Sequence, residues 1–343
     1  MKSILTSLLL MLLSNSFVFS QSLITVQHNG TPTFFASLDS AIIASQNGDT
    51  IYVPGGSFNL TTSINKILHV FGVGHNPDST LATDRTVISG GVNLLSGASG
   101  GSLTGIYFQS GTTYNTGQIL FSDNVIGYKI SRCYISGGIS CDSAGTTNIV
   151  ISECMIGEYS LCFTCSNWYS ISMLTSVNNL ISNNITKAKV RAKESSILNN
   201  ILLNNSNDAL SCNSCLIENN IAISNSTNYH SSCVFHNNIN LGVNGVVGNG
   251  NQGSNNYLGI QFNPLFVNYS GVLDYTSNFH LVQGSLYINA GFDGTDIGIY
   301  GGLYPWKEGS VPFNPHIQLK NIANTTDANG NLNINIQVGA QDH

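Results

Sequence analysis

A motif of five or six residues recurs about every twenty residues through the middle of this chain. Ile130-Ser-Arg-Cys-Tyr-Ile and Ile151-Ser-Glu-Cys-Met-Ile start 21 residues apart. The same frame then reads Ile181-Ser-Asn-Asn-Ile, Ile197-Leu-Asn-Asn-Ile, Ile217-Glu-Asn-Asn-Ile and Phe235-His-Asn-Asn-Ile, at intervals of 16, 20 and 18 residues. Helical repeats need periods of roughly 33 to 47 residues, and the Leu-x-x-Leu-x-Leu pattern of leucine-rich repeats is absent from the sequence. The period therefore predicts coils of three short strands, stacked as a parallel β-helix.

Stacked coils place equivalent residues above one another at a spacing of about 4.8 Å. Asn side chains in such a column hydrogen-bond to the coils above and below, and Asn tolerates the left-handed backbone conformation that a coil corner requires. We therefore interpret the Asn-Asn pairs as a structural asparagine ladder, with sugar binding by these residues as the alternative. The predicted column consists of Ile106, Cys133, Cys154, Asn184, Asn200, Asn220 and Asn238.

Charged residues are scarce, at 8% of the chain, whereas ordinary globular proteins have about 25%. The hydrophobic content of 42% and the regular spacing of Ile, Val and Leu exclude a disordered chain. The formal net charge of −6 argues against a nucleic-acid partner, because nucleic-acid-binding proteins carry a basic surface.

The first twenty residues are expected to be a signal peptide rather than part of the fold. Lys2 supplies the positive start, and the apolar run from Ile4 to Leu13 is too short to span a bilayer. Cleavage is expected before Gln21, and no later stretch approaches 18 consecutive apolar residues. We therefore expect a soluble, exported protein without a membrane span, extracellular or periplasmic, and a monomer.

Two segments outside the central repeats resemble parts of a known superfamily. Residues 38–56, from Leu38-Asp-Ser-Ala-Ile-Ile to Tyr52-Val-Pro-Gly-Gly, resemble the start of pectin-lyase-like right-handed β-helices, where a short helix caps the first coil. Asn263-Pro-Leu-Phe, Phe279-His-Leu, Ile288-Asn-Ala-Gly and Asp296-Ile-Gly-Ile-Tyr-Gly-Gly resemble the closing coils of bacterial right-handed β-helix repeat proteins. The resemblance implies an all-β, single-stranded right-handed parallel β-helix over residues 21–305. It does not imply one activity, because this superfamily includes lyases, hydrolases and adhesins.

The tail, residues 306–343, alternates apolar and polar side chains on either side of a turn. His316-Ile-Gln-Leu-Lys precedes Asp327-Ala-Asn-Gly, and Leu332-Asn-Ile-Asn-Ile-Gln-Val follows. This pattern predicts a C-terminal β-hairpin with one buried face, either packed on the last coils, where it would cover an open sheet edge, or separate from them.

Eight cysteines lie between positions 133 and 233. An even number in an exported protein favours disulfides, but cysteines stacked in a coil column also suit free, buried thiols, which is our first interpretation. Cys162/Cys165 and Cys212/Cys215 have the CxxC spacing of a zinc site, although the two pairs are about fifty residues apart. We predict no metal.

One segment concentrates positive charge. Lys187, Lys189, Arg191 and Lys193 alternate with Ala188, Val190 and Ala192, so on a strand the four cations would share the outer face. Such a stripe is suited to an acidic polysaccharide; the alternative is a solvated strand face that prevents edge pairing. We predict these four residues as ligand-binding.

Catalysis at this stripe would be β-elimination on a uronate, with Lys189 and Arg191 as the weak catalytic candidates. The reaction needs a base for the C5 proton and a cation that neutralises the carboxylate, which calcium can supply. The nearest carboxylates, Glu153, Asp208 and Glu218, form no calcium-binding cluster in the sequence, and Arg132 and Glu153 are expected to form a surface ion pair.

The motifs of known β-helix enzymes are missing from the sequence. The Gly-His-Gly and Arg-x-Lys of polygalacturonases are absent, as are the Trp-x-Asp-His and Arg-x-Pro-x-x-Arg of pectate lyases. Asp293 and Asp296 suggest calcium, but Asp and Gly also form turns, which explains them better. The leading hypothesis is therefore an exported β-helix that binds polysaccharide or serves as a surface structural module; the alternative is a lyase acting on an acidic glycan.

Overall fold

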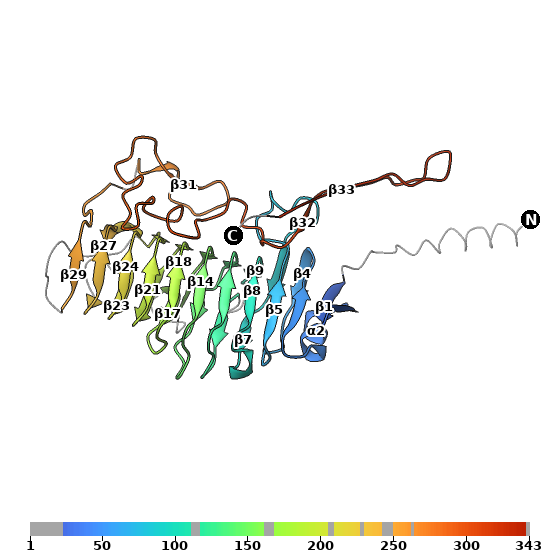
Figure 1. Ribbon diagram of the computed structural model, residues 1–343, viewed down its shortest axis with the longest axis horizontal. Coiled ribbons are helices and arrows are strands. Elements are labelled where there is room, and N and C mark those ends of the chain that lie inside the picture. Colours follow the sequence, from blue (N-terminus) through green and yellow to red (C-terminus); the bar gives the residue numbers. More distant parts are fainter. Residues whose placement is uncertain are drawn as a thin grey trace, which may run out of the picture.

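The fold is known from a computed structural model, which describes residues 23–110, 117–160, 168–204, 209–226, 230–241, 250–261 and 264–340. The signal peptide expected at residues 1–20, together with Cys162, Cys165 and Asp208, lies outside these ranges. Within them the chain winds into stacked coils, with successive strands lying side by side along the length of the molecule (Figure 1). The prediction of a parallel β-helix is confirmed.

The strands form three long sheets, named here A, B and C. Apart from β1 and β2 of sheet A and β16 of sheet C, each of which pairs antiparallel, the strands within each sheet run parallel. In spatial order, sheet A contains β2 (Thr31–Phe35), β1 (Ile24–His28), β3 (Asp49–Tyr52), β5 (Leu68–Phe71), β8 (Ser102–Thr104), β11 (Lys129–Ser131), β14 (Val150–Ser152), β18 (Leu180–Ser182), β21 (Ser196–Leu198), β24 (Leu216–Glu218), β27 (Val234–His236) and β29 (Gln252–Ser254). Sheet B contains β4 (Gly56–Asn59), β6 (Thr86–Ser89), β9 (Tyr107–Gln109), β12 (Tyr134–Ile135), β15 (Met155–Ile156), β19 (Ile185–Thr186), β22 (Ile201–Leu202), β25 (Ile221–Ser226) and β28 (Ile239–Leu241). Sheet C contains β7 (Val92–Leu94), β10 (Ile119–Phe121), β13 (Ile139–Ser140), β17 (Trp168–Met173), β20 (Lys189–Lys193), β23 (Leu210–Asn213) and β26 (His230–Ser231), with β16 (Tyr159–Ser160) beside β17.

The predicted column of Cys and Asn residues forms a continuous ladder at the corner between sheets A and B. The backbone N–H of Asn184 donates to Oδ1 of Asn200 at 2.9 Å, and the N–H of Asn200 donates to Oδ1 of Asn220 at 2.9 Å. At the other end, Sγ of Cys154 accepts from the N–H of Cys133 at 3.4 Å. The structural interpretation of the Asn-Asn pairs is therefore confirmed.

A second ladder, not predicted from the sequence, lies at the other end of the sheet A strands. The N–H of Asn179 donates to Oγ of Ser195 at 3.2 Å, the N–H of Cys215 to Sγ of Cys233 at 3.4 Å, and the N–H of Cys233 to Oδ1 of Asn251 at 3.0 Å. In both ladders the preceding residue has positive φ, and the two corners are five residues apart in each coil. The successive pairs are Asn148 and Glu153, Asn178 and Asn183, Glu194 and Asn199, Ser214 and Asn219, and Ser232 and Asn237.

The six described cysteines are free and buried inside the coils, which agrees with our first interpretation: Cys133, Cys141, Cys154, Cys212, Cys215 and Cys233. Burial raises the pKa of the Cys141 and Cys154 thiols well above the usual value. These thiols therefore pack as small hydrophobic groups.

The structure differs from the expectation that coils continue to residue 305. Among the described residues, the last strand of the parallel sheets is β29, and the return segment that follows, residues 258–261 and 264–315, runs back along the outside of the coils toward their N-terminal end (Figure 1). This return segment contains one antiparallel pair, β30 (Phe266–Asn268) and β31 (Asn278–Leu281). Its Leu265, Phe266, Phe279, Ile297 and Ile299 form a second hydrophobic core with the outer side chains of sheet B.

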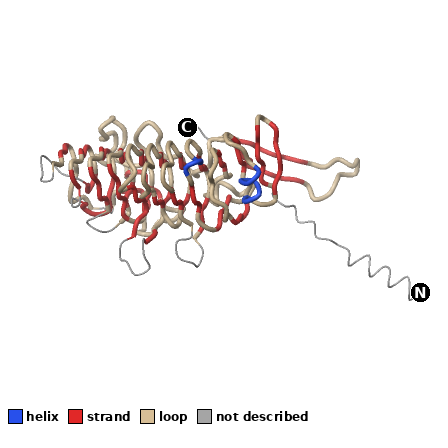
Figure 2. Tube along the Cα trace, turned by 90° about the horizontal axis from the view of Figure 1, so that it is seen from below, coloured by secondary structure: helices blue, strands red, loops and turns tan. Residues whose placement is uncertain are grey.

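The first and last elements lie at the same end of the molecule. Helix α2 (Leu38–Ala44) buries Leu38, Ala41 and Ile42 against the first coil, and η1 (Ser96–Ala98) is a short 3-10 turn. The tail forms an antiparallel hairpin of β32 (His316–Ile322) and β33 (Ile334–Gly339), beside the N-terminal coils in Figure 2 rather than on the last ones. The expected buried face is wrong, because Leu319, Ile336 and Val338 are all exposed.

Candidate binding surface on sheet C

The predicted cationic segment is a strand, and its alternation is as expected. Strand β20 buries Val190 and Ala192 completely, while Lys189, Arg191 and Lys193 alternate with them toward the outside. Lys187 lies just before the strand and is exposed. The strand position is confirmed for Lys189, Arg191 and Lys193 but not for Lys187, and the binding role of all four stays a prediction.

Carboxylates lie close to three of these cations, and only Glu194, next to Lys193, is apparent from the sequence. Nζ of Lys187 lies 2.9 Å from Oε1 of Glu158, and Nζ of Lys193 lies 3.2 Å from Oε1 of the adjacent Glu194. The guanidinium of Arg191 lies 3.2 Å from Oδ2 of Asp142. Three of the four cations therefore already have an acidic partner.

Arg191 is the most firmly held of the four cations. Its Nη2 donates to Oγ of Ser172 at 2.6 Å, and its Nε donates to the same oxygen at 3.1 Å. Its guanidinium carbon lies 3.9 Å from the centre of the Tyr169 ring, in the range where cation–π attraction is strong. Nζ of Lys189 lies 5.8 Å from the same ring centre. Tyr169 thus has one cation close to its face and a second nearby.

The position of Tyr169 follows from an irregularity in β17. Tyr169 aligns with Lys189, and Ser172 aligns with Arg191. Tyr169 and Ser172 are three residues apart on β17, whereas their partners Lys189 and Arg191 are only two apart on β20. The extra residue, Ser170, is buried and donates to the carbonyl of Gly157. A bulge of this kind redirects the side chains on both sides of it, and here both Tyr169 and Ser172 reach Arg191.

Asp142 completes the cluster from the neighbouring coil. Its Oδ1 accepts from the N–H of Leu174 at 2.6 Å, and its Oδ2 accepts from the Ser172 hydroxyl as well as from Arg191. Trp168, the residue before Tyr169, leaves 48% of its surface exposed on the same strand. We call Asp142, Trp168, Tyr169, Lys189 and Arg191 the sheet C cluster. It combines an open aromatic side chain with fixed donors and acceptors, the groups that recognise a sugar.

The sequence reasoning missed Asp142, Ser172 and Tyr169. Asp142 and Arg191 are 49 residues apart and lie two coils apart, and the first of these coils is long, because Ile139 aligns with Ile171 in the next strand of sheet C. The adjacent Trp168-Tyr169 pair, in a chain with two tryptophans, was the available signal.

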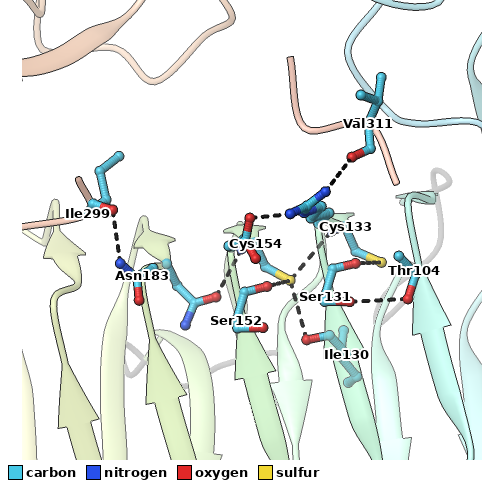
Figure 3. A network of polar contacts seen from close by, with 12 residues as sticks. Thr104, Ile130, Ser131, Cys133, Ser152, Cys154, Asn183, Ile299 and Val311 are labelled. Carbon is cyan, nitrogen blue, oxygen red and sulfur yellow. Dashed lines mark hydrogen bonds and ion pairs between the residues drawn. The ribbon is translucent and has the colours of Figure 1, made fainter. Parts of the chain in front are cut away.

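Other predicted residues have structural roles. The Arg132–Glu153 pair was expected on the surface, but it is buried beneath the return segment: Nε of Arg132 lies 2.9 Å from Oε2 of Glu153. Nη1 of Arg132 donates to the carbonyl of Val311, which approaches from the return segment in Figure 3. Burial raises the pKa of the Glu153 carboxyl, against the opposing effect of Arg132. Oδ1 of Asp293 accepts from the backbone and hydroxyl of Thr295, which is a turn contact.

The described ranges contain neither a cluster of metal-binding side chains nor a membrane-spanning helix. No three His, Cys, Asp or Glu side chains of the described residues are grouped as a metal site would require. None of the helices in the same ranges has the length and apolar character needed to cross a bilayer.

Comparison with known proteins identifies no relative by sequence. No family model matches the chain, and no curated protein matches it. Among solved structures, the chain is similar to the full-length structure of QnrB1, a plasmid-mediated fluoroquinolone resistance protein, with 13% identity over 58% of this chain and 94% of that chain. The TM-score is 0.22, so this likeness carries no argument about function.

Proposed function

We propose that this chain is an exported, monomeric β-helix that binds extracellular polysaccharide on the outer face of sheet C. For the fold, we propose a right-handed helix of a single chain, related to the pectin-lyase-like superfamily, with α2 covering its N-terminal end. Resemblance of residues 38–56 to that superfamily supports the relationship, and the apolar run near residue 4 supports export.

The observation that carries the binding proposal is the arrangement around Tyr169. Arg191 and Lys189 lie near the buried ring of Tyr169, and Trp168, the preceding residue in the chain, is exposed. Sugar rings pack their apolar faces on aromatic side chains, while charged and polar groups fix their hydroxyl and carboxylate oxygens. Because Asp142 and Ser172 already hold Arg191 in place, little side-chain entropy is lost on binding.

Binding of polysaccharide to the purified chain tests this proposal. Retention on a glycan array or in affinity electrophoresis is expected to fall at least tenfold in Trp168→Ala and in Arg191→Gln. Lys129→Gln is the matched control, because it removes one exposed cation from sheet A and leaves sheet C intact. If Lys129→Gln weakens retention as much as Arg191→Gln, the binding follows overall charge, and the sheet C surface is not the site.

A lyase acting on a uronate glycan is the second candidate function, supported by the closeness of Lys189 and Arg191 to Tyr169. One of these residues would take the C5 proton, and the electron pair of the C5–H bond would form the C4–C5 double bond as the C4–O bond breaks. The leaving oxygen would receive its proton from the other residue in its protonated form or from water. Calcium would have to compete for Asp142, which already accepts from Ser172, Leu174 and Arg191. Ultraviolet absorbance of the unsaturated product, lost in Lys189→Ala, would establish a lyase and replace the binding-only proposal.

A further inference from the structure

A groove lies between the C-terminal hairpin and the outer face of sheet A, at the N-terminal end of the coils. One wall contains Thr25, Tyr52 and Phe71, from strands β1, β3 and β5. The other wall contains Ile317 and Ile336, from strands β32 and β33. The volume of the groove is about 460 Å³, which is within the range of small-molecule sites, about 300–1,000 Å³.

The sheet A wall of this groove is apolar and partly aromatic. Tyr52 and Phe71 are aligned in the strand register, and their rings stack with centres 6.0 Å apart. Tyr52 leaves 39% of its surface exposed, and Leu23 leaves 46% exposed at the same wall. The aromatic stack therefore offers a hydrophobic contact surface across two neighbouring strands.

The hairpin turns its more apolar face toward the groove. The register pairs Ile336 with Lys320, and both residues line the groove. Leu319 pairs with Gln337 and lies on the opposite face, because side chains alternate along a strand. Ile336 leaves 48% of its surface exposed. Since a two-stranded hairpin alone is marginally stable in water, a ligand in the groove would stabilise it by covering this face.

The charge that lines the groove is positive. Lys320 is exposed there and forms no ion pair within the described part of the chain. Of the residues that the structure describes, no Asp or Glu lines this groove: Asp84 lines a separate groove, and Asp78 and Glu308 line another. His316 is shared with the groove of Asp78 and Glu308. Lys320 is therefore the cation that an anionic ligand would meet in this groove.

We propose that this hairpin groove binds a fatty acid, with the acyl chain between Tyr52 and Ile336 and the carboxylate at Lys320. An acyl chain is narrow and apolar, so it suits two apolar walls, and its carboxylate supplies the charge that Lys320 would pair with. Each methylene removed from water increases the affinity roughly threefold to fourfold. The groove is on a different sheet from the sheet C cluster, so the proposal does not depend on polysaccharide binding there.

Titration calorimetry of the full chain with decanoate tests the proposal. Wild-type protein is expected to bind decanoate, and to bind hexanoate, which has four fewer methylenes, at least tenfold more weakly. Lys320→Gln should weaken decanoate binding about tenfold. Decanol, which has no charge, should bind wild type as weakly as decanoate binds Lys320→Gln.

Two substitutions on opposite faces of the hairpin test where the acyl chain lies. Ile336→Asn should weaken the binding of decanoate and of decanol at least tenfold. Leu319→Asn is the matched control, because Leu319 is 44% exposed on the face away from the groove, and it should leave both affinities unchanged. If Ile336→Asn fails to fold by circular dichroism, Tyr52→Ala on the other wall takes its place with the same expected loss.

Several outcomes would overturn the assignment. Equal affinity of wild type and Lys320→Gln for decanoate would show that Lys320 does not bind the carboxylate. Equal losses in Ile336→Asn and Leu319→Asn would show that decanoate adsorbs to the hairpin as a whole. Equal affinity for decanoate and hexanoate would show that the acyl chain is not in the groove. Absence of decanoate binding to wild type would refute the site, and a dimer in light scattering that Ile336→Asn dissociates would then assign the groove to a second copy of this chain.

Discussion

Replacing one rung of the asparagine ladder should show how much this column stabilises the coils. The amide of Asn220 is fully buried and donates to the carbonyls of Ile197 and Glu218 at 2.8 and 2.9 Å. It also donates to Oδ1 of Asn238 at 3.0 Å, and its own Oδ1 accepts from the N–H of Asn200 at 2.9 Å. The side chain therefore connects three successive coils.

The expected cost follows from the groups that Asn220→Ala leaves without a partner. The N–H of Asn200 and the carbonyl of Ile197 both lose the bond that the amide supplied. Each buried orphan costs about 1–3 kcal/mol, so the substitution is expected to lower the free energy of unfolding by about 2–6 kcal/mol.

Asn220→Cys is the informative second variant, because cysteine occupies the same column naturally. Sγ of Cys154 accepts from the backbone of Cys133, and it lies 3.2 Å from the carbonyl of Ser152. A thiol at position 220 should therefore recover part of the loss and make this variant more stable than Asn220→Ala.

Urea unfolding followed by far-ultraviolet circular dichroism measures this order. Asn213→Ala serves as the control, because that side chain is exposed on strand β23, and surface substitutions usually change stability by less than about 0.5 kcal/mol. If Asn220→Ala is no less stable than Asn213→Ala, the ladder bonds do not hold the coils together. If Asn220→Cys and Asn220→Ala have the same free energy of unfolding, the thiol does not replace the hydrogen bonds of the amide.

Three further predictions concern the residues around the return segment. Burial and a nearby arginine charge hold the pKa of His75 at about 3, below its ordinary 6.5. The contribution of neutral His75 to the free energy of unfolding is therefore complete above pH 6.5. It is lost as the pH falls toward 3, by up to about 1.4 kcal/mol per pH unit. Calorimetric melting of His75→Gln should accordingly show a shallower slope over that interval, and an unchanged slope would refute it. Glu153→Gln should cost about 3–5 kcal/mol, because the charge of Arg132 remains buried without its carboxylate; limited proteolysis should then cleave the return segment faster than in wild type. Deleting residues 258–343 uncovers the outward apolar side chains of sheet B. The shortened chain should therefore bind a hydrophobic dye and self-associate, as measured by light scattering. A shortened chain that stays monomeric and binds no dye would show that the return segment does not cover an apolar core.

The repeat motif was sufficient to predict the coils, because the inward positions carry a fixed residue type. Asn200 and Asn220 are recognisable in the sequence since only a few side chains suit a buried corner with a ladder of hydrogen bonds. The second ladder was missed because its positions vary among Asn, Ser and Cys, as at Asn179, Ser195 and Cys215. Its available signal was the five-residue interval between the two positive-φ corners of each coil.

The return segment was not predictable in the same way. The residue after each Asn-Asn pair is apolar, as in Ile185 and Ile201, and the sequence analysis assigned it to neither face. Because the corner turns the chain after each ladder residue, this side chain points outward and needs a separate cover. An outward isoleucine repeated in every coil is the mark of a sheet that is buried on both faces.

The outer faces of the three sheets differ in whether their side chains need an apolar cover. This difference helps to distinguish residues that stabilise the fold from residues that are available for binding. The isoleucine column of sheet B requires an apolar cover, and the return segment supplies it. Tyr107 and Tyr134 interrupt the aliphatic residues of that column near the end of the cover. Tyr169 likewise reaches the outer face of sheet C only through the bulge at Ser170. Stacking of the coils does not require that bulge, and for this reason we place the proposed binding surface on sheet C.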